Sequence, residues 1–344
     1  MTVLLNTLYA TTPESYLRLE GETLSVMIEK EKRLQVPLHH LGAIVCVGEV
    51  GMSPALMARC ADDGRSIAWL DRAGRFKARV EGPVNGNVLL RQAQYRVADN
   101  AEITLELSRS FLAGKLRNSR NVLMRGAREN SSDEEKKVLV SNARLIAGHV
   151  RKLPLARELD SLRGAEGDSA RLYFRAFQYL IGAKVRDSYS FDNRNRRPPR
   201  DRVNAVLSFL YAILLNDCRS ALESVGLDPQ LGFLHAVRPG RMALALDLME
   251  EFRAILADRL ALTLINRGQL QTRDFEEREG GSVLLNDSGR KTVVTAYQER
   301  KREQLKHPVL DQHVLVGLLP HLQSRLLASY LRGDVQVYVP YLHK

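Results

Sequence analysis

The chain has 344 residues, of which 44% are hydrophobic, so it can bury a sizeable core, and its length favours two domains over one. Its formal net charge of +11 indicates a polyanionic partner, although surplus lysine and arginine can also serve solubility. The sequence has no apolar run of about eighteen residues and no basic segment followed by an apolar run at its start, which predicts a cytoplasmic protein without a membrane span.

Residues 1–95 are predicted to form a β-rich domain. Short runs of β-branched and aromatic residues alternate there with turn residues such as Gly21 and Gly74. Ser53 and Pro54 are suited to begin a helix over residues 53–61, as its cap and its first residue. The domain has no cluster of catalytic side chains, and its exposed sheet is suited to dimerisation or to a partner. Strands are expected at residues 2–8, 16–20, 24–28, 43–47, 66–70 and 76–80.

Residues 96–344 are predicted to form a larger, mainly α-helical domain with an appended β-hairpin, which makes the fold class α+β. Residues 282–295 are expected to form the hairpin, with Asn286 to Gly289 as its turn, and a helix is expected at 295–306. Apolar residues at helical spacing predict further helices at residues 103–123, 134–152, 203–221 and 241–266.

Arginine is concentrated in two segments of this domain. The first, between Arg109 and Arg128, contains no acidic residue, and the second, between Arg194 and Arg202, contains only Asp201. Solvated faces usually mix their charges, and the guanidinium fork matches phosphate geometry, so both segments are predicted to follow DNA phosphates. The predicted DNA-binding residues are Arg117, Arg120, Arg125, Arg128, Arg194, Arg196, Arg197 and Arg200.

Three residues of the stretch 226–253 could form a metal site. Asp247 and Glu250 lie three apart on a predicted helix, so both carboxylates can reach one point, and His235 lies in the loop before that helix. Oxygen ligands with one imidazole suit magnesium or, more readily, manganese. Arg253 follows Glu250 at the same spacing, however, so a salt bridge could satisfy the acid without a metal.

Glu166 is a further candidate whose position alone does not decide its role. It lies between Gly164 and Gly167 at the predicted start of a helix. An acid in the first turn complements the helix dipole and needs no other function.

Several motifs of the chain resemble those of the CRISPR-associated endonuclease and integrase that inserts new spacers into CRISPR arrays. The segments PPRDRVNAVLSFLYAILL, GLDPQLGFLH and LALDLMEEFR resemble its C-terminal half. The opening LLNTLYATTPESYLRLEGETLSV, with GMSPALMARCADDG and GNVLLRQAQYR, is similar to the form found in type I-C systems. The motifs occur in the family's order and cover most of the chain.

This resemblance implies a set of roles. Glu166 is expected to be the first metal ligand, with His235 and Glu250 completing the site and Asp247 as a further ligand or a supporting group. Members of the family differ in which acid fills the last two positions, and His235 could instead donate a proton. The implied reaction is attack by a protospacer 3′-hydroxyl on array DNA, or by water if the site cuts DNA, with Mg²⁺ or Mn²⁺ as cofactor.

The resemblance also implies partners. These are double-stranded DNA of the protospacer and the CRISPR repeat, a second copy of the chain in a homodimer, a small ferredoxin-like Cas protein, and an adaptation-associated Cas exonuclease.

Two alternatives remain open at this point. The chain could be a non-catalytic DNA-binding scaffold in which the acids and the histidine pair with Arg253 and Arg241, or a metal-dependent nuclease unrelated to adaptation. The sequence has no GxxxxGK[ST] loop, GxSxG elbow or paired-cysteine zinc motif, which argues against ATP use and serine hydrolysis. Its three cysteines lack CxxC spacing and are expected to be free thiols.

Overall fold

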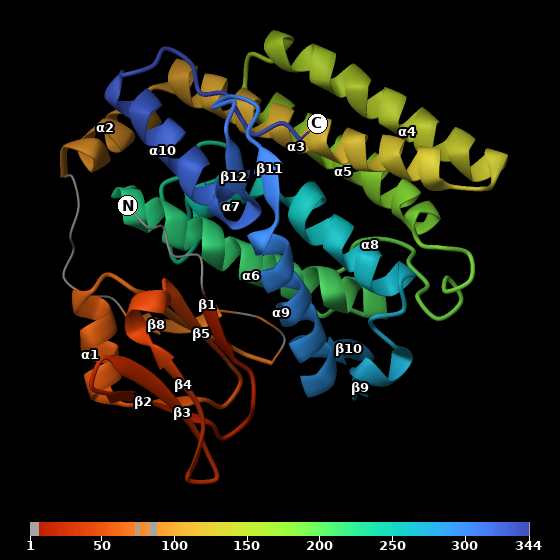
Figure 1. Cartoon of the computed structure of the whole chain (residues 1–344). Coiled ribbons are helices and arrows are strands. Elements are labelled where there is room, and N and C mark those ends of the chain that lie inside the picture. Colours follow the sequence, from red (N-terminus) through yellow and green to blue (C-terminus); the bar gives the residue numbers. More distant parts are fainter. Residues whose placement is uncertain (1–6, 73, 75, 81, 83–87, 344) are drawn as a thin grey trace.

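The computed structural model describes residues 7–72, 74, 76–80, 82 and 88–343, which form a β-rich N-terminal part and a larger helical part (Figure 1). This is the α+β fold class that the sequence predicts, with a β-hairpin on the helical part. The first expected strand, at residues 2–8, lies mostly outside the described residues.

The N-terminal part contains two four-stranded sheets and one helix. The first sheet has the order β1-β5-β7-β8, with β1, β5 and β7 parallel and β8 antiparallel. The second has the order β4-β3-β2-β6 and ends in the β4 edge strand. Ser53 caps α1 as predicted, since its hydroxyl accepts the Leu56 amide at 3.3 Å. The elements are β1 (Thr7–Ala10), β2 (Tyr16–Glu20), β3 (Thr23–Ile28), β4 (Glu31–Pro37), β5 (Ala43–Val47), β6 (Gly51–Met52), α1 (Pro54–Asp62), β7 (Ser66–Leu70) and β8 (Phe76–Val80).

The helical part is arranged around α6, which lies between the N-terminal sheets and the remaining helices (Figure 1). Helices α3, α4 and α5 pack against one another, and α3 also contacts α7. The elements are α2 (Val88–Ala98), α3 (Ala101–Glu129), α4 (Asp133–Lys152), α5 (Leu159–Phe177), α6 (Arg202–Val225), α7 (Ala243–Glu250), a π-helical turn (Arg253–Asp258), α8 (Arg259–Asn266), β9 (Phe275–Arg278), β10 (Ser282–Leu285), α9 (Asp287–Arg302), β11 (Gln304–Lys306), β12 (His313–Leu315) and α10 (Leu319–Arg332).

Helix α6 forms part of the core. Its length and apolar composition would allow it to cross a membrane, but 67% of its apolar window is buried inside the protein. Asp201 caps it, because a carboxylate oxygen accepts the Asn204 amide at 2.7 Å. The αL residue Gly226 ends it (φ 89°), in the conformation that glycine adopts without steric cost.

The hairpin lies earlier in the chain than predicted. Strands β9 and β10 pair through Gly280 and Gly281, both with positive φ. The segment expected as its turn begins α9 instead, because the Asn286 side chain accepts the Gly289 amide at 3.0 Å and caps that helix. A cluster of Asn, Asp, Ser and Gly suits a helix start as well as a turn. The glycine pair directly before β10, Gly280 and Gly281, was the better signal for the turn of the hairpin.

The predicted domain division after residue 95 falls inside α2. This helix belongs to the helical part, since Gln94 is fully buried and its amide donates to Asp228 O at 2.8 Å and Leu231 O at 3.0 Å. The last strand of the N-terminal part ends at Val80. The division into two independently folding domains stays a prediction.

Candidate active site

Asp247 organises the loop that carries His235. Its carboxylate accepts the backbone amides of Phe233 at 2.6 Å, Leu234 at 3.0 Å and His235 at 2.9 Å. Asp247 Oδ1 also lies 2.7 Å from His235 Nδ1. A carboxylate can only accept there, so Nδ1 carries the proton and Nε2 is free for a metal or a proton. Both oxygens of Asp247 are thereby used in holding this loop.

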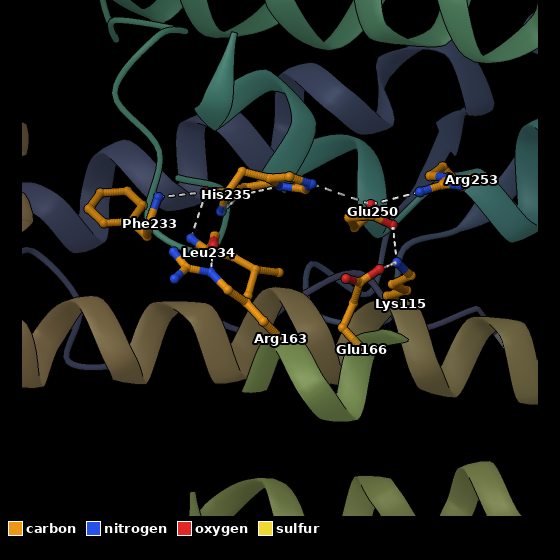
Figure 2. A network of polar contacts seen from close by, with 9 residues as sticks. Lys115, Arg163, Glu166, Phe233, Leu234, His235, Glu250 and Arg253 are labelled. Atoms are coloured by element: carbon orange, nitrogen blue, oxygen red, sulfur yellow. Dashed lines mark hydrogen bonds and ion pairs between the residues drawn. The ribbon is translucent and has the colours of Figure 1, made fainter. Parts of the chain in front are cut away.

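Glu166, Glu250 and Lys115 form the second half of the site (Figure 2). The Lys115 ammonium bonds Glu166 Oε1 and lies 3.0 Å from Glu250 Oε2. His235 Nε2 lies 3.9 Å from Glu250 Oε1 on the other side. Glu166 of α5, His235 of the loop before α7 and Glu250 of α7 therefore lie around one point, as the resemblance implied.

Helix α5 brings Glu166 to this point. The helix begins at Leu159, so Glu166 lies about two turns inside it, and the first-turn dipole role considered for it does not apply. One turn earlier, Arg163 Nε donates to Leu234 O at 3.2 Å, which joins α5 to the histidine loop (Figure 2).

Glu250 is buried yet charged. Burial raises the pKa of its carboxyl, but Arg253 and Lys115 outweigh burial and hold that pKa at about 2. The Arg253 pair expected as an alternative to a metal is present, with Arg253 Nη1 2.8 Å from Glu250 Oε1. The second oxygen, Oε2, has no hydrogen-bond partner, because the Lys115 contact lies outside hydrogen-bond geometry.

Within the described residues, no three histidine, cysteine, aspartate or glutamate side chains stand close enough together to hold a metal ion in this conformation. The reason is visible at Lys115, whose ammonium lies between the two carboxylates. The donor set nevertheless fits a divalent ion. Two carboxylates converge on the Lys115 ammonium, and the imidazole nitrogen Nε2 of His235 lies 3.9 Å from Glu250 Oε1.

A large basic cavity opens onto this site. Its volume is about 1490 Å³, and His235 and Glu250 line it. Asn204 shapes its wall, because the Asn204 amide oxygen accepts from Arg194 at 2.6 Å and its nitrogen donates to Asn193 O at 2.8 Å. The arginines that line the cavity are Arg171, Arg175, Arg194, Arg196, Arg197, Arg241 and Arg253.

The predicted DNA-binding arginines fall into two places. Arg194, Arg196 and Arg197 line the cavity, although Arg194 also donates to Ser208 Oγ at 3.0 Å and supports its wall. Arg200 is exposed but does not line it. The four arginines of α3 do not line it either, because Arg117, for example, follows Lys115 by about 200° around the helix and faces away. DNA contact by those four, Arg117, Arg120, Arg125 and Arg128, stays a prediction.

Sequence reasoning missed several residues that hold the site. Lys115 is one, and the buried group of Tyr211 and Asp258 is another. The Tyr211 hydroxyl donates to Asp258 at 2.6 Å, and the Arg253 guanidinium lies 4.4 Å from the Tyr211 ring. The sequence did offer a signal for Lys115 and Asp258, because both are charged residues within apolar helical stretches and a buried charge requires a partner.

The chain is similar to known proteins over most of its length. The family model "CRISPR associated protein Cas1" matches residues 8–299. The "CRISPR-associated endonuclease Cas1 1" of Moorella thermoacetica is 52% identical over 344 residues, with 100% of both chains covered. The protein of the same name from Chlorobaculum tepidum is 47% identical over 98% of both chains. A "CRISPR-associated exonuclease Cas4/endonuclease Cas1 fusion" of Geobacter sulfurreducens is 34% identical over 96% of this chain and 59% of its own.

The fold is similar to three solved structures, each 22% identical. A Cas1 protein from Thermotoga maritima has a TM-score of 0.81, covering 96% of this chain and 98% of its own. A casposase bound to integration product has a TM-score of 0.83, covering 98% and 94%. A Cas6-RT-Cas1–Cas2 complex has a TM-score of 0.85, covering 100% of this chain and 37% of that one. At this identity the likeness shows the fold alone.

Proposed function

Because the chain belongs to the CRISPR associated protein Cas1 family, we propose that Glu166, His235 and Glu250 form the metal-binding centre of its reaction. The activity is that of a DNA endonuclease and integrase of CRISPR adaptation, and it depends on a divalent metal ion. The non-catalytic scaffold considered from the sequence is set aside by this family membership.

The observation that supports the proposal most is the shared cation. Glu166 and Glu250 both contact the Lys115 ammonium, although they lie 84 residues apart in the chain, and His235 Nε2 lies 3.9 Å from Glu250 Oε1. Two carboxylates that converge at the edge of a cavity lined by arginines repel one another unless a cation lies between them. Such an arrangement is suited to a metal ion and a phosphodiester side by side.

The residues divide the chemistry between them. A 3′-hydroxyl attacks the phosphorus of an array phosphodiester, the new P–O bond forms, and the bond to the leaving oxygen breaks, so that oxygen gains a proton as the attacking hydroxyl loses one. A divalent ion bound here would activate the attacking hydroxyl and stabilise the leaving oxygen. Asp247 keeps the His235 proton on Nδ1, so that Nε2 faces Glu250, while Arg196, Arg197 and other cavity arginines would bind the neighbouring phosphates.

The metal is Mg²⁺ or Mn²⁺, and the donor set favours Mn²⁺. Two carboxylates suit both ions, but an imidazole nitrogen suits Mn²⁺ better than Mg²⁺. Calorimetric titration of the chain should therefore give tighter binding of Mn²⁺ than of Mg²⁺, and His235→Gln should reduce that difference.

Double-stranded DNA and other Cas proteins are the partners of this function. The finer partners are the protospacer, the CRISPR repeat, a small ferredoxin-like Cas protein and an adaptation-associated Cas exonuclease; fusions of Cas4 with Cas1 among the relatives support the last. A homodimer through the N-terminal sheets is also part of the proposal. Its support is the β4 edge strand, where Leu34 is 45% exposed beside unpaired backbone groups.

A strand-joining assay tests the centre. A labelled duplex is incubated with a repeat-containing plasmid and Mn²⁺, with and without the small partner protein. Glu166→Gln, Glu250→Gln and His235→Ala should each reduce joining by at least about 100-fold while DNA binding and folding persist. Asp168→Asn is the matched control, because Asp168 is an exposed carboxylate on the same helix as Glu166. Wild-type rates in the three variants would refute the centre.

A further inference from the structure

Two cations lie against the Glu250 carboxylate, and they are held in different ways (Figure 2). The Lys115 ammonium lies 3.0 Å from Glu250 Oε2 and also contacts Glu166, so it lies between the two carboxylates, where a metal ion would bind. The Arg253 guanidinium contacts the other oxygen, with Nη1 2.8 Å from Oε1. Metal binding therefore has to displace Lys115, but it can leave Arg253 in place.

The Arg253 guanidinium lies over the ring of Tyr211, which belongs to α6. The centre of the guanidinium is 4.4 Å from the ring centroid, within the distance at which an aromatic face attracts a cation. Burial lowers the pKa of Arg253, but Glu250, Tyr211 and Asp258 outweigh burial and raise that pKa well above its ordinary value. Because the guanidinium is planar and donates only within its plane, the ring beneath it fixes the direction in which Arg253 donates to Glu250.

Asp258 in turn holds the Tyr211 ring. The Tyr211 hydroxyl donates to Asp258 Oδ1 at 2.6 Å, and the Tyr173 hydroxyl donates to Oδ2 at 2.9 Å. Asp258 is only 2% exposed, and hydrogen bonds to a carboxylate are stronger than those between neutral groups. The Arg194 guanidinium lies 5.1 Å from the same ring, so the ring and the carboxylate behind it also offset the repulsion between Arg194 and Arg253.

The π-helical turn is what brings Asp258 to this group. Arg253 and Asp258 are its first and last residues, and at its end the Arg259 amide donates to Ala254 O, five residues back. In an α-helix two residues five apart point to different sides, whereas a turn that closes on the fifth residue places them on the same side. An unbroken α-helix would therefore turn Asp258 away from Tyr211 and Arg253.

We propose that Tyr211 is a positioning residue that acts through Arg253. Its ring holds the guanidinium on Glu250 Oε1, so that the Glu250 carboxylate keeps one orientation before and after a metal ion replaces Lys115. The inference rests on the proposed function and deepens it, because it adds to the metal-binding centre a residue that fixes one ligand without being a ligand. Lys115 and Arg253 thereby have separate roles: one is exchanged for the metal, and the other stays.

A double-mutant cycle tests whether Tyr211 acts through Arg253. Tyr211→Leu removes the ring, and Arg253→Lys keeps the charge but not the plane. Each single variant should lower the single-turnover rate of strand joining, at saturating protein and Mn²⁺, about tenfold, which is the effect of losing one desolvated cation–π contact. The double variant should be no slower than the slower single variant, whereas two independent residues would together cost about 100-fold. The affinity for DNA should stay at the wild-type value, because both single variants keep every positive charge.

Calorimetric titration with Mn²⁺ gives a readout that does not depend on activity. Both single variants should bind Mn²⁺ about tenfold more weakly than wild type, because the carboxylate is no longer preorganised. Tyr173→Phe is the matched control, since it removes a hydroxyl from the same Asp258 carboxylate but leaves the ring over Arg253 in place. It should match wild type in joining and in Mn²⁺ affinity. If thermal unfolding shows that Tyr211→Leu does not fold, Tyr211→Met takes its place in the cycle, because methionine adapts to the space left by the ring.

Two results would overturn the role of Tyr211. One is a double variant whose loss is the product of the single losses, and the other is Mn²⁺ affinity in the Tyr211 variant that equals or exceeds that of wild type. Glu250→Gln is measured in the same assay to separate this inference from the proposed function. Wild-type joining by Glu250→Gln would refute the centre itself, whereas a multiplicative cycle beside an inactive Glu250→Gln would refute only the positioning by Tyr211.

Discussion

At the scale of single residues, Lys115 determines the state of the metal-free site. Its side chain is 10% exposed, and its ammonium contacts Glu166 and Glu250, where a bound metal would have to lie. A buried carboxylate requires a cation, and in the metal-free protein Lys115 supplies it. A metal ion entering the site must displace this ammonium, which would then be free to contact a phosphate.

Lys115→Met should therefore make stability depend on metal. Methionine has a side chain of similar length but no charge, so Glu166 loses its Lys115 partner and Glu250 keeps only Arg253. In EDTA the variant should lose about 3 kcal/mol of unfolding free energy, the usual cost of breaking a buried pair. Mn²⁺ should restore most of the loss and bind more tightly than to wild type, as measured by thermal unfolding and calorimetric titration.

Lys136→Met is the control, since Lys136 forms an exposed pair with Asp133 on α4 and should change neither quantity. Equal melting temperatures of Lys115→Met and wild type in EDTA, or weaker Mn²⁺ binding by the variant, would contradict this role of Lys115.

The sequence predicted the part of the site that depends on local spacing. His235, Asp247 and Glu250 lie within one loop and one helix, so helical periodicity was enough to place them together. Glu166 was assigned only through the resemblance, because its position depends on how α5 packs against α3 and α7. Lys115 was not singled out, since a helix with arginines on its outer face does not reveal which cation points inward.

At the scale of elements, the loop 233–235 and α7 form one unit through Asp247. Asp247→Asn should separate them, because an amide offers one accepting oxygen where the carboxylate accepts three backbone amides and the imidazole. The NH₂ group would face donors, at a cost of about 2 kcal/mol. Thermal unfolding should show this loss, and joining activity should fall although Glu166 and Glu250, the proposed metal ligands, are intact. Unchanged stability and activity would show that Asp247 does not hold the loop.

The segment after α10 is held by buried polar groups of α3 and α7. The Asn118 amide donates to Tyr341 O at 2.8 Å, and its oxygen accepts the His343 amide at 2.8 Å. Glu251, the neighbour of Glu250, accepts the Tyr341 amide at 2.6 Å and the Tyr338 hydroxyl. The segment thus packs behind the helix that carries the active-site carboxylate.

Acid should loosen this segment through His343. Burial and Arg259 lower the pKa of His343 to about 4 from 6.5, and Arg259 lies 2.9 Å from its Nε2. The neutral form is therefore favoured in the folded state, and the stability it contributes is complete above pH 6.5 and is lost as the pH falls towards 4. At pH 5, but not at pH 7.5, hydrogen exchange of residues 335–343, corrected for intrinsic rates, should show less protection in wild type than in a variant whose residue 343 does not titrate.

His343→Gln should lose this pH dependence, because glutamine does not titrate. Glu251 acts in the opposite direction: burial raises its pKa to about 7, so proton uptake stabilises the folded state as the pH falls below 7. The variant retains that effect, and its protection should not decrease at pH 5. An equal decrease in wild type and variant would remove His343 as the cause.

Element boundaries were predictable where a cap or a breaker marks them. Ser53 begins α1 as expected, and α6, which Asp201 caps, begins one residue before the helix predicted at 203–221. The long helix expected at 241–266 instead contains the π-helical turn Arg253–Asp258. Hydrophobic periodicity cannot reveal such a turn, which here coincides with the buried contacts of Arg253 and Asp258 beside the site.

At the scale of the whole molecule, α6 joins the two parts of the chain. One side of it meets the N-terminal part, where Glu223 pairs with Arg79 and Ser220 Oγ lies 3.0 Å from Ser66 Oγ. Its Tyr211 contributes to the active-site cavity. The sequence predicted both parts from their different periodicities, but not their relative placement, which depends on side-chain fit between segments more than a hundred residues apart.

Gly74 is the closest point of that fit, and Gly74→Ala should uncouple the two parts. A Cβ there would lie 2.7 Å from the Phe209 ring and 3.3 Å from the Phe209 Cα, and the residue has a φ of +78°.

Gly64→Ala is a matched control, because Gly64 has a φ of +66° but nothing within 4 Å of its added Cβ. Both variants should lose about 1 kcal/mol to the left-handed backbone conformation. Only Gly74→Ala should lose more, and in calorimetry its N-terminal part should unfold at a lower temperature than the helical part. Leu70 and Phe76 on that part line a basic cavity of about 640 Å³ together with Arg196 and Arg197. Gly74→Ala should therefore also weaken DNA binding, whereas Gly64→Ala should not. Identical unfolding and DNA affinity of the two variants would mean that the contact with α6 does not couple the parts.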